Sequence, residues 1–291
     1  TVGQNGDGQL GLGNFTSRDT WAKTNITGAT QIAAGYRHGL AIVGGSVRAW
    51  GRNTEGQLGD GTTTNRSSPI TVAGSNISQI AAGARFSLAL GGGNVFAWGS
   101  NPLGQLGNGT TTSSLSPVQV HGLSGVQQIA AGASTGYGVI NGVVYAWGLN
   151  AYGQFGNGGT TDALTPVSTS ASNVSRLIAA GLNAYAIAGG RMWAWGTNTN
   201  GQMGDGTTTQ RNSPIAVPGL NSVTDIAAGV SNAYAMANGS SIYAWGYNGS
   251  GQLGQNFSSS TSASSPVVVP GTSGVTKLGG GNQGSSIFFI R

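Results

Sequence analysis

Short stretches of alternating apolar and polar residues recur along the chain, and each ends in a Trp-Gly pair. In the first clear copy, Val47 and Ala49 alternate with Arg48 and Trp50, which places the two pairs on opposite faces of an extended chain. The slot of Arg48 holds an aromatic residue in the later copies: Phe96, Tyr145, Trp193 and Tyr243. No segment keeps a 3.6-residue apolar period, so the pattern predicts strands, with helices few or absent.

The Trp-Gly pair belongs to a unit of about 48 residues that occurs six times. An Asn-x-x-Gly-Gln turn follows the pair, with its glutamine at Gln9, Gln57, Gln105, Gln154, Gln202 and Gln252. A polar Gly-Thr-Thr stretch, Ser-Pro with a Val-rich strand, an Ala-Ala-Gly strand and a last apolar strand complete the unit; the small residues indicate that another backbone comes close. Such a period is typical of propellers, solenoids and arrays. The six copies account for almost all residues of the chain, so we expect residues 1–291 to form a single domain.

The two ends of the chain complement each other. Val2-Gly3 occupies the Trp-Gly slot, whereas Ile287-Phe288-Phe289-Ile290 is the apolar strand that comes before such a slot. We therefore expect the first strand to belong to the last repeat and to close a ring, which removes free sheet edges. A solenoid would instead need terminal repeats with a polar face, and none is visible in the sequence.

Residues 32–42, Ile-Ala-Ala-Gly-Tyr-Arg-His-Gly-Leu-Ala-Ile, followed by residues 47–59, Val-Arg-Ala-Trp-Gly-Arg-Asn-Thr-Glu-Gly-Gln-Leu-Gly, resemble the regulator of chromosome condensation repeat. The resemblance covers the whole chain and implies a β-propeller of four-stranded blades. With six repeats, the expected fold is an all-β, closed six-bladed β-propeller of antiparallel blades, its N-terminal strand completing the last blade. The repeats look closer to those of bacterial secreted or surface members than to those of the nuclear exchange factor that names the family, which implies an extracellular or cell-surface location.

Composition narrows the classes of function. Only 7% of residues are charged, but 38% hydrophobic content with seven tryptophans is enough for a folded core. The net charge of +5 comes from basic residues scattered singly, which argues against nucleic-acid binding. Cysteine is absent, so thiolate metal ligands and disulfides are excluded. No apolar run is long enough for membrane insertion.

Several apparent motifs are better explained by turns and by the core. Residues 6–11 and 249–254 match Gly-x-Gly-x-x-Gly, but no helix follows to hold a pyrophosphate, so we expect no nucleotide and no other cofactor. The slot of Asp60 and Asp205 holds Asn in other repeats, which favours turn chemistry over a calcium site. The tryptophans keep a fixed register, which favours core packing over a carbohydrate platform. The few acids and two histidines form no catalytic or metal-binding pattern, so we expect no enzyme.

The residues directly after Ala-Ala-Gly differ between repeats, although the strands on either side hardly change. Variable loops on a constant scaffold are where binding residues usually lie. The predicted binding residues are Tyr36, Arg37, His38, Arg85, Phe86, Leu182 and Asn183. Tyr36, Arg37, Arg85 and Phe86 would form an aromatic and basic patch across two blades, a composition enriched at interface hot spots. The alternative is that these loop residues are ordinary surface residues and that His38 forms a local hydrogen bond that holds the blade.

These observations favour a non-enzymatic scaffold that binds a protein or another macromolecule through one propeller face; whether it also self-associates is left open. In propellers that the chain resembles, the same loop slot lies at one end of the ring and supplies aromatic and arginine contacts. One alternative is therefore a secreted protein similar to β-lactamase-inhibitor propellers. An alternative of another class is a hydrolase or lyase acting on polysaccharides, with its site in the central channel.

Overall fold

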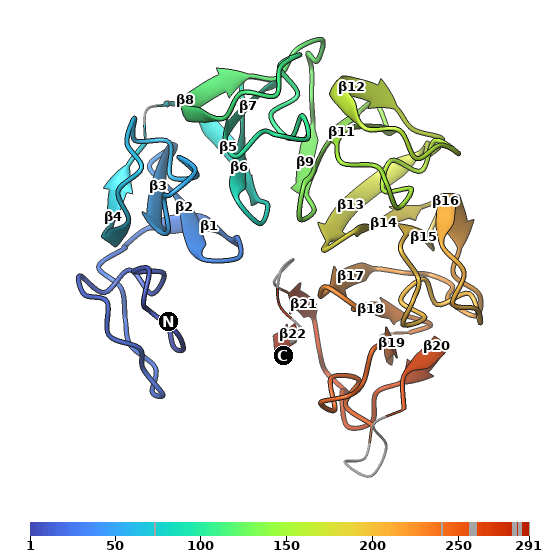
Figure 1. The fold of residues 1–291 in the computed structure, drawn as a ribbon. Helices are drawn as coiled ribbons and strands as arrows, with labels where there is room; N and C mark the ends of the chain where they lie inside the picture. The colour runs from blue at the N-terminus through green and yellow to red at the C-terminus, as the bar shows by residue number, and fades with distance from the viewer. Residues whose placement is uncertain (73, 240, 256–260, 281–283, 285–286, 291) are drawn as a thin grey trace. The chain divides into compact units, whose positions relative to one another are not determined.

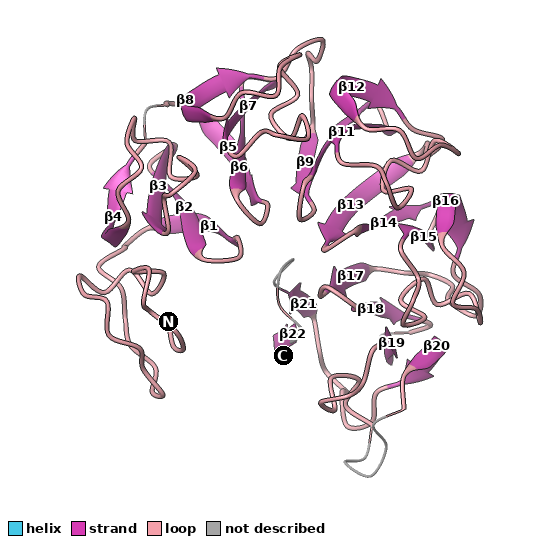
Figure 2. Ribbon diagram, viewed as in Figure 1, coloured by secondary structure: helices cyan, strands magenta, loops and turns pink. Residues whose placement is uncertain are grey.

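The computed structural model describes residues 1–72, 74–239, 241–255, 261–280, 284 and 287–290. These residues form strands and connecting loops without a helix, as Figures 1 and 2 show. They divide into two compact units: unit 1 is Thr1–Ile140, Ala146–Leu149 and Asp162–Val167, and unit 2 is Asn141–Tyr145, Asn150–Thr161 and Ser168–Arg291. The prediction of an all-β chain is confirmed for the described residues, whereas the single domain stays a prediction.

Three four-stranded sheets lie wholly or mostly in unit 1, and in each the strands are neighbours in chain order. The first contains β1 (Ala29–Ala34), β2 (His38–Val43), β3 (Ser46–Gly51) and β4 (Arg66–Thr71). The second contains β5 (Ile77–Ala82), β6 (Phe86–Gly91), β7 (Asn94–Gly99) and β8 (Ser114–Gln119). The third contains β9 (Gln128–Ala131), β10 (Thr135–Ile140), β11 (Val143–Gly148) and β12 (Ala163–Ser168). Each sheet therefore corresponds to one blade.

Unit 2 contains two further four-stranded sheets and one sheet of two strands. The four-stranded sheets are β13 (Val174–Ala180), β14 (Asn183–Ala188), β15 (Arg191–Gly196) and β16 (Arg211–Ala216), then β17 (Asp225–Ala228), β18 (Asn232–Ala237), β19 (Ser241–Gly246) and β20 (Ala263–Val268). The two-stranded sheet pairs β21 (Lys277–Gly280) with β22 (Ile287–Ile290). Neighbouring strands are antiparallel, as expected for blades.

Glycine pairs make the tight hairpins inside the blades. In the first blade only Gly44 and Gly45 separate the paired residues Val43 and Ser46, and their φ angles are 58° and 74°. A two-residue turn with positive φ at both positions matches the right-handed twist of the flanking strands and strongly favours Gly or Asn. Gly92-Gly93, Asn141-Gly142 and Gly189-Gly190 occupy the same place in later blades.

The prolines of the Ser-Pro pairs lie inside the last strands of the four-stranded sheets. Pro69 is the fourth residue of β4, which is the last strand of its sheet. The register between β3 and β4 is irregular here, because Ala49 pairs with Ile70 whereas Gly51 pairs with Arg66. A bulge on an edge strand is a place where a missing N–H breaks no ladder hydrogen bond.

The tryptophans of the Trp-Gly pairs are core residues that join one repeat to the turn of the repeat before it. All five are buried, and the indole Nε1 of Trp98 donates to the carbonyl oxygen of Gln57 at 2.9 Å. The other four make the same bond to the preceding glutamine, at Gln9, Gln105, Gln154 and Gln202. A Cβ on Gly59 would lie 2.8 Å from the Trp98 ring, so the last glycine of the turn makes room for the indole.

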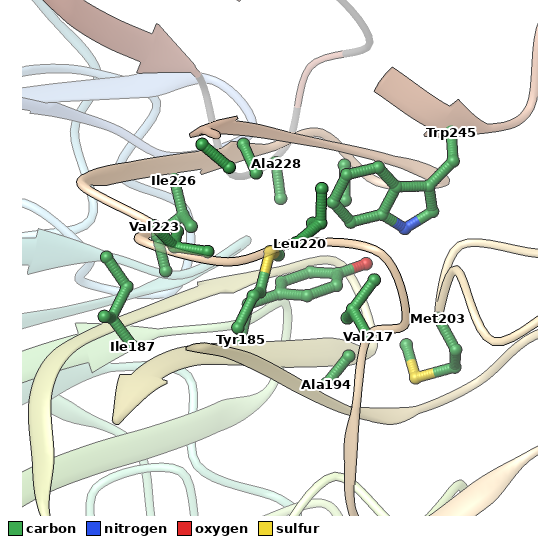
Figure 3. Close-up of a cluster of buried hydrophobic side chains, with 14 of the residues drawn as sticks. Tyr185, Ile187, Ala194, Met203, Val217, Leu220, Val223, Ile226, Ala228 and Trp245 are labelled. Carbon is green, nitrogen blue, oxygen red and sulfur yellow. The ribbon is translucent and has the colours of Figure 1, made fainter. Parts of the chain in front are cut away.

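Hydrophobic contacts between successive blades continue this core. Figure 3 shows the cluster in unit 2 in which Trp245 and Ile226 of one blade pack with Tyr185, Met203 and Val217 of the blade before it. In unit 1, Leu40 and Val47 of the first blade pack in the same way against Ile80 and Trp98 of the second. The core prediction for the tryptophans is confirmed.

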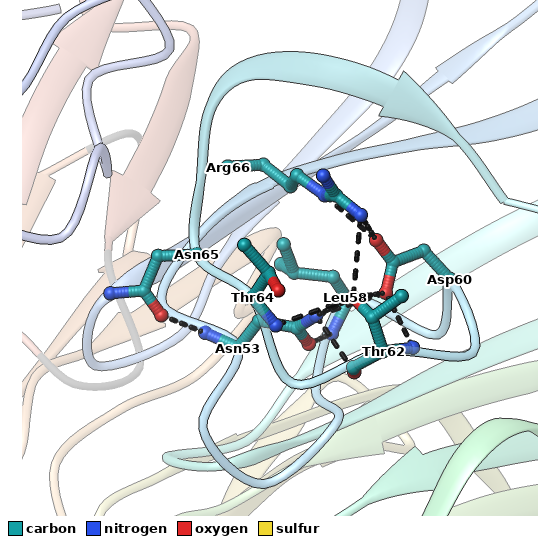
Figure 4. Close-up of polar contacts among 7 residues, drawn as sticks. All are labelled: Asn53, Leu58, Asp60, Thr62, Thr64, Asn65 and Arg66. Carbon is teal, nitrogen blue, oxygen red and sulfur yellow. Dashed lines mark hydrogen bonds and ion pairs between the residues drawn. The ribbon is translucent and has the colours of Figure 1, made fainter.

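The Asn-x-x-Gly-Gln turn is built around a buried asparagine side chain. Asn53 Oδ1 accepts the Leu58 N–H at 2.9 Å, and its Nδ2 donates to the Thr62 carbonyl at 3.0 Å (Figure 4). The Asp60 carboxylate accepts from Thr62 and from Arg66 Nε at 2.8 Å. Burial opposes ionisation of Asp60, but hydrogen bonds from Thr62 and Arg66 outweigh it and hold the pKa of the carboxyl below its usual value. Asp60 is therefore a turn residue.

Replacing Trp98 by Ala should lower the free energy of unfolding by about 3–5 kcal/mol, because the change leaves a cavity between two blades and removes the bond to the Gln57 carbonyl. Chemical denaturation measures the loss. Trp21→Ala is the matched control: Trp21 is 74% exposed, so this change should alter stability by less than about 0.5 kcal/mol. Wild-type stability of the Trp98 variant would contradict the core assignment.

Candidate functional site

The loop after Ala-Ala-Gly joins the first and second strands of a blade and is held by backbone hydrogen bonds. The carbonyl oxygen of Arg37 accepts the N–H of Arg52, the residue after Trp-Gly, at 2.8 Å. In the second blade the Arg85 carbonyl accepts the Ser100 N–H at 2.9 Å. The loop of that blade also touches the next blade, since Ala84 N donates to the Ala133 carbonyl at 2.9 Å. This confirms the close backbone approach expected at Ala-Ala-Gly.

Tyr36 and Arg37 lie on the surface of unit 1. The Tyr36 side chain is 61% exposed, and the Arg37 guanidinium lies 5.5 Å from the centre of its ring. Arg37 Nη1 donates to Asp7 Oδ2 at 2.9 Å, and this hydrogen bond, with the charge of Asp7, raises the pKa of Arg37. Asp7 Oδ1 in turn accepts from Asn65 Nδ2 at 3.1 Å. The tyrosine is therefore solvent-facing, and the arginine beside it is held by a carboxylate.

The second blade repeats the arginine–carboxylate arrangement. Glu55 Oε1 lies 3.5 Å from Arg85 Nη1 and 3.5 Å from Arg52 Nη2. Partial burial opposes ionisation of Glu55, but hydrogen bonds from Thr54 and Gln57 and the two arginines lower the pKa of its carboxyl. The Arg85 side chain remains 59% exposed. Three arginines thus share two carboxylates on this surface, which leaves it with an excess positive charge.

His38 is buried and binds the neighbouring blade. Its Nε2 lies 2.9 Å from Ser87 Oγ, and Ser87 Oγ lies 2.8 Å from the Gln57 carbonyl oxygen. Because a carbonyl only accepts, the serine hydroxyl donates to Gln57 and accepts from His38 Nε2–H. His38 Nδ1 has no hydrogen-bond partner and is buried. Burial lowers the pKa of His38 to about 4, so the imidazole is neutral at pH 7. The His38 side chain therefore joins the first blade to the second.

Phe86 and Asn183 are also buried, and the prediction of an exposed Phe86 in the patch is wrong. Phe86 is fully enclosed, with its ring over Gly83, because the third residue of the loop turns back into the blade. Asn183 Nδ2 donates to the Thr197 carbonyl at 2.5 Å. Leu182 is half-buried, and it belongs with Asn183 to unit 2. The exposed part of the predicted site is therefore Tyr36, Arg37 and Arg85 of unit 1, whose role in binding stays a prediction.

Sequence reasoning missed the partners of the two loop arginines. Asp7 and Glu55 occupy the same slot of successive turns, and each lies 30 residues before the arginine that it pairs with (37 − 7 and 85 − 55). This constant spacing between opposite charges was the available signal. Within the described residues, no three His, Asp or Glu side chains lie close enough together to hold a metal ion. No helix among them has the length and apolarity needed to cross a bilayer.

Comparison with known proteins places the chain in a family. The family model described as the RCC1-like domain matches residues 1–287. The chain belongs to the RCC1-like domain family. This confirms the resemblance seen in the repeats. A sequence search of curated proteins gave no match.

Three solved structures are similar to this RCC1-like domain protein. Human WBSCR16 has a TM-score of 0.82 and 22% identity, covering 95% of this chain and 77% of its own. Yeast RCC1 (Prp20), in a complex with Kap60, has a TM-score of 0.84 and 20% identity, covering 96% and 74%. Prp20p from Saccharomyces cerevisiae, described together with its binding to Gsp1p and histones, has a TM-score of 0.82 and 20% identity, covering 95% and 75%. At these identities the likeness shows the fold, an RCC1-like β-propeller.

Stability of the chain should fall as the pH drops from about 6.5 towards 4. Unfolded His38 titrates near its ordinary pKa of 6.5, whereas the buried folded form does so near 4, so the unfolded state takes up the proton first. The slope in this window should be about 1.4 kcal/mol per pH unit for this group. Urea unfolding at several pH values measures it.

A His38→Gln variant should lose this component of the pH dependence, while His121→Gln, at an exposed position, should keep it. Equal slopes for wild type and His38→Gln between pH 6.5 and 5 would contradict the assignment of a neutral, buried His38.

Proposed function

We propose that this chain is a non-enzymatic scaffold that binds a protein partner through the surface formed by Tyr36, Arg37 and Arg85. The observation that carries the proposal is an exposed tyrosine stacked with an arginine on one loop and a second exposed arginine on the corresponding loop of the following blade, both loops being held by backbone hydrogen bonds. Tyr and Arg are enriched at interface hot spots, and contacts held in place before binding lose less conformational entropy.

The ion pairs of this surface support binding over catalysis. Asp7 and Glu55 are engaged with arginines, so their carboxylates serve to position guanidinium groups. The excess of arginine favours a partner with carboxylate groups at its interface. The similar yeast protein Prp20 binds a protein, Kap60, which supports the same kind of role for this family member.

We also infer that the protein is bacterial and has an extracellular or cell-surface location, as the resemblance of its repeats implies. Detection of the protein in culture supernatant or on intact cells tests this location.

The immobilised protein can be used to capture proteins from the source organism's culture. The amount of partner captured by the double variant Tyr36→Ala/Arg85→Ala should be at least tenfold lower than the amount captured by wild type, because the variant lacks the exposed ring and one guanidinium. Quantitative mass spectrometry of the retained proteins measures the loss. Tyr247→Ala/Arg191→Ala removes the same residue types from exposed positions of unit 2 and is the matched control. Partner retention that falls equally in both variants, or in neither, would contradict the proposal.

We further propose that the chain closes as a six-bladed ring in which residues 1–22 supply the outer strands of the last blade. Gly3 pairs with Arg18 by an isolated bridge, just as Gly51 at the equivalent slot pairs with Arg66. β21 and β22 correspond to the first two strands of a blade, since Gly280 pairs with Ile287 as Ala34 pairs with Gly39. Residues 1–22 thus match the second half of a blade, and β21 with β22 matches the first half.

The repeat register makes this closure testable. Gly39 is opposite Trp50 in the first blade, so Ile287 should be opposite Val2. The variant Val2→Cys/Ile287→Cys should form an intramolecular disulfide, because the chain has no other cysteine and the two Cβ atoms would face each other across neighbouring strands. Peptide mapping by mass spectrometry detects it. The control is Val2→Cys/Lys277→Cys, because Lys277 is not the residue that this register places opposite Val2. A disulfide that forms only between two chains would contradict closure of the ring within one chain.

A further inference from the structure

The first blade departs from the others at the slot two residues before the tryptophan of the Trp-Gly pair. Phe96, Tyr145, Trp193 and Tyr243 occupy this slot in the later blades, and all four are half-buried. In the fifth blade the Tyr243 hydroxyl accepts from Asn238 Nδ2 at 3.0 Å, so the aromatic side chain reaches the turn that joins the second and third strands. The first blade has Arg48 instead, whose Nη1 donates to the Thr71 hydroxyl.

A surface depression lies at this position in unit 1. Its volume is about 370 Å³, and its lining comes from the segment before β1, from the end of β2, and from the middle of β3 and β4: Asn25, Ile26, Thr27, Val43, Arg48, Ser68 and Pro69. This volume is within the range of small-molecule sites. Ile26, Val43 and Pro69 give it an apolar wall, Asn25, Thr27 and Ser68 supply polar groups, and Arg48 supplies a cation.

The charge in the depression is not neutralised by its lining. None of the lining residues is acidic, and in the described part of the chain Arg48 belongs to none of the ion pairs. Most other arginines of unit 1 differ in this respect, since Arg37, Arg52, Arg66 and Arg85 each face a carboxylate. With Nη1 bound to Thr71, the Nε and Nη2 donors of Arg48 form the edge that receives a carboxylate with two parallel hydrogen bonds.

We propose that this depression binds a small aliphatic monocarboxylate, whose carboxylate pairs with Arg48 and whose chain lies against Ile26, Val43 and Pro69. The site is distinct from the Tyr36–Arg85 surface and does not depend on the function proposed for it. Among the described four-stranded sheets, the first is the one with a cation at this slot: where the other four place a ring, it has a flexible arginine beside open volume.

Titration of the full chain with hexanoate, followed by NMR of the Val43 and Ile26 methyl groups and the Arg48 Nε–H, tests the proposal. Hexanoate should shift these resonances in a saturable way and bind at least tenfold more tightly than acetate, which lacks the chain, or 1-hexanol, which lacks the charge. Arg48→Tyr, which installs the residue of two other blades, and Arg48→Gln should each weaken hexanoate binding at least tenfold.

Arg191→Gln removes an exposed arginine of unit 2 and should leave hexanoate binding unchanged. Thermal melting of each variant shows whether the fold is kept, and Arg48→Gln retains the test if Arg48→Tyr disturbs the blade. The proposal is overturned if wild type shows no saturable shift, if hexanol binds as tightly as hexanoate, or if both Arg48 variants bind hexanoate like wild type.

Discussion

The structure depends on one repeated interaction, the hydrogen bond from a tryptophan indole to the carbonyl of a glutamine in the preceding repeat. It joins residues about 41–43 positions apart in all five copies, and the glycine of the same turn gives the indole its space. A single repeat cannot bury its tryptophan by itself. Each blade therefore needs the turn of the blade before it, which makes the fold cooperative from neighbour to neighbour.

Side chains also join the first strands of successive blades. Gln31 accepts the Ile80 N–H at 2.9 Å and donates to its carbonyl at 3.1 Å, and Gln79 does the same for Ile129 in the next blade. In unit 2 a charged pair takes this place: Arg176 donates to Asp225, whose other oxygen accepts the Leu278 N–H at 2.9 Å. Backbone groups on the first strands of separate sheets are thus satisfied by side chains.

This scaffold explains which loop residues are available to a partner. The first two loop residues of the first blade, Tyr36 and Arg37, point to solvent, whereas the next residue, His38, enters the space between blades and bonds to Ser87. The surface residues Tyr36 and Arg37 and the blade-contact residue His38 are therefore consecutive in the chain. The carboxylates that hold Arg37 and Arg85 come from the turns that also bind the tryptophans, so the repeated core positions the variable surface.

The sequence by itself determined the strands, the blade period and the core role of the tryptophans, because these follow from alternation, glycine pairs and a fixed register within one repeat. The family also followed, because two linked motifs recur along the whole chain. Only the tertiary structure decided the burial of His38, Phe86 and Asn183 and the pairing of Arg37 with Asp7. A loop side chain turns inwards or outwards according to contacts that its own neighbours in sequence do not encode: Ser87 is 49 residues from His38, and Asp7 is 30 from Arg37.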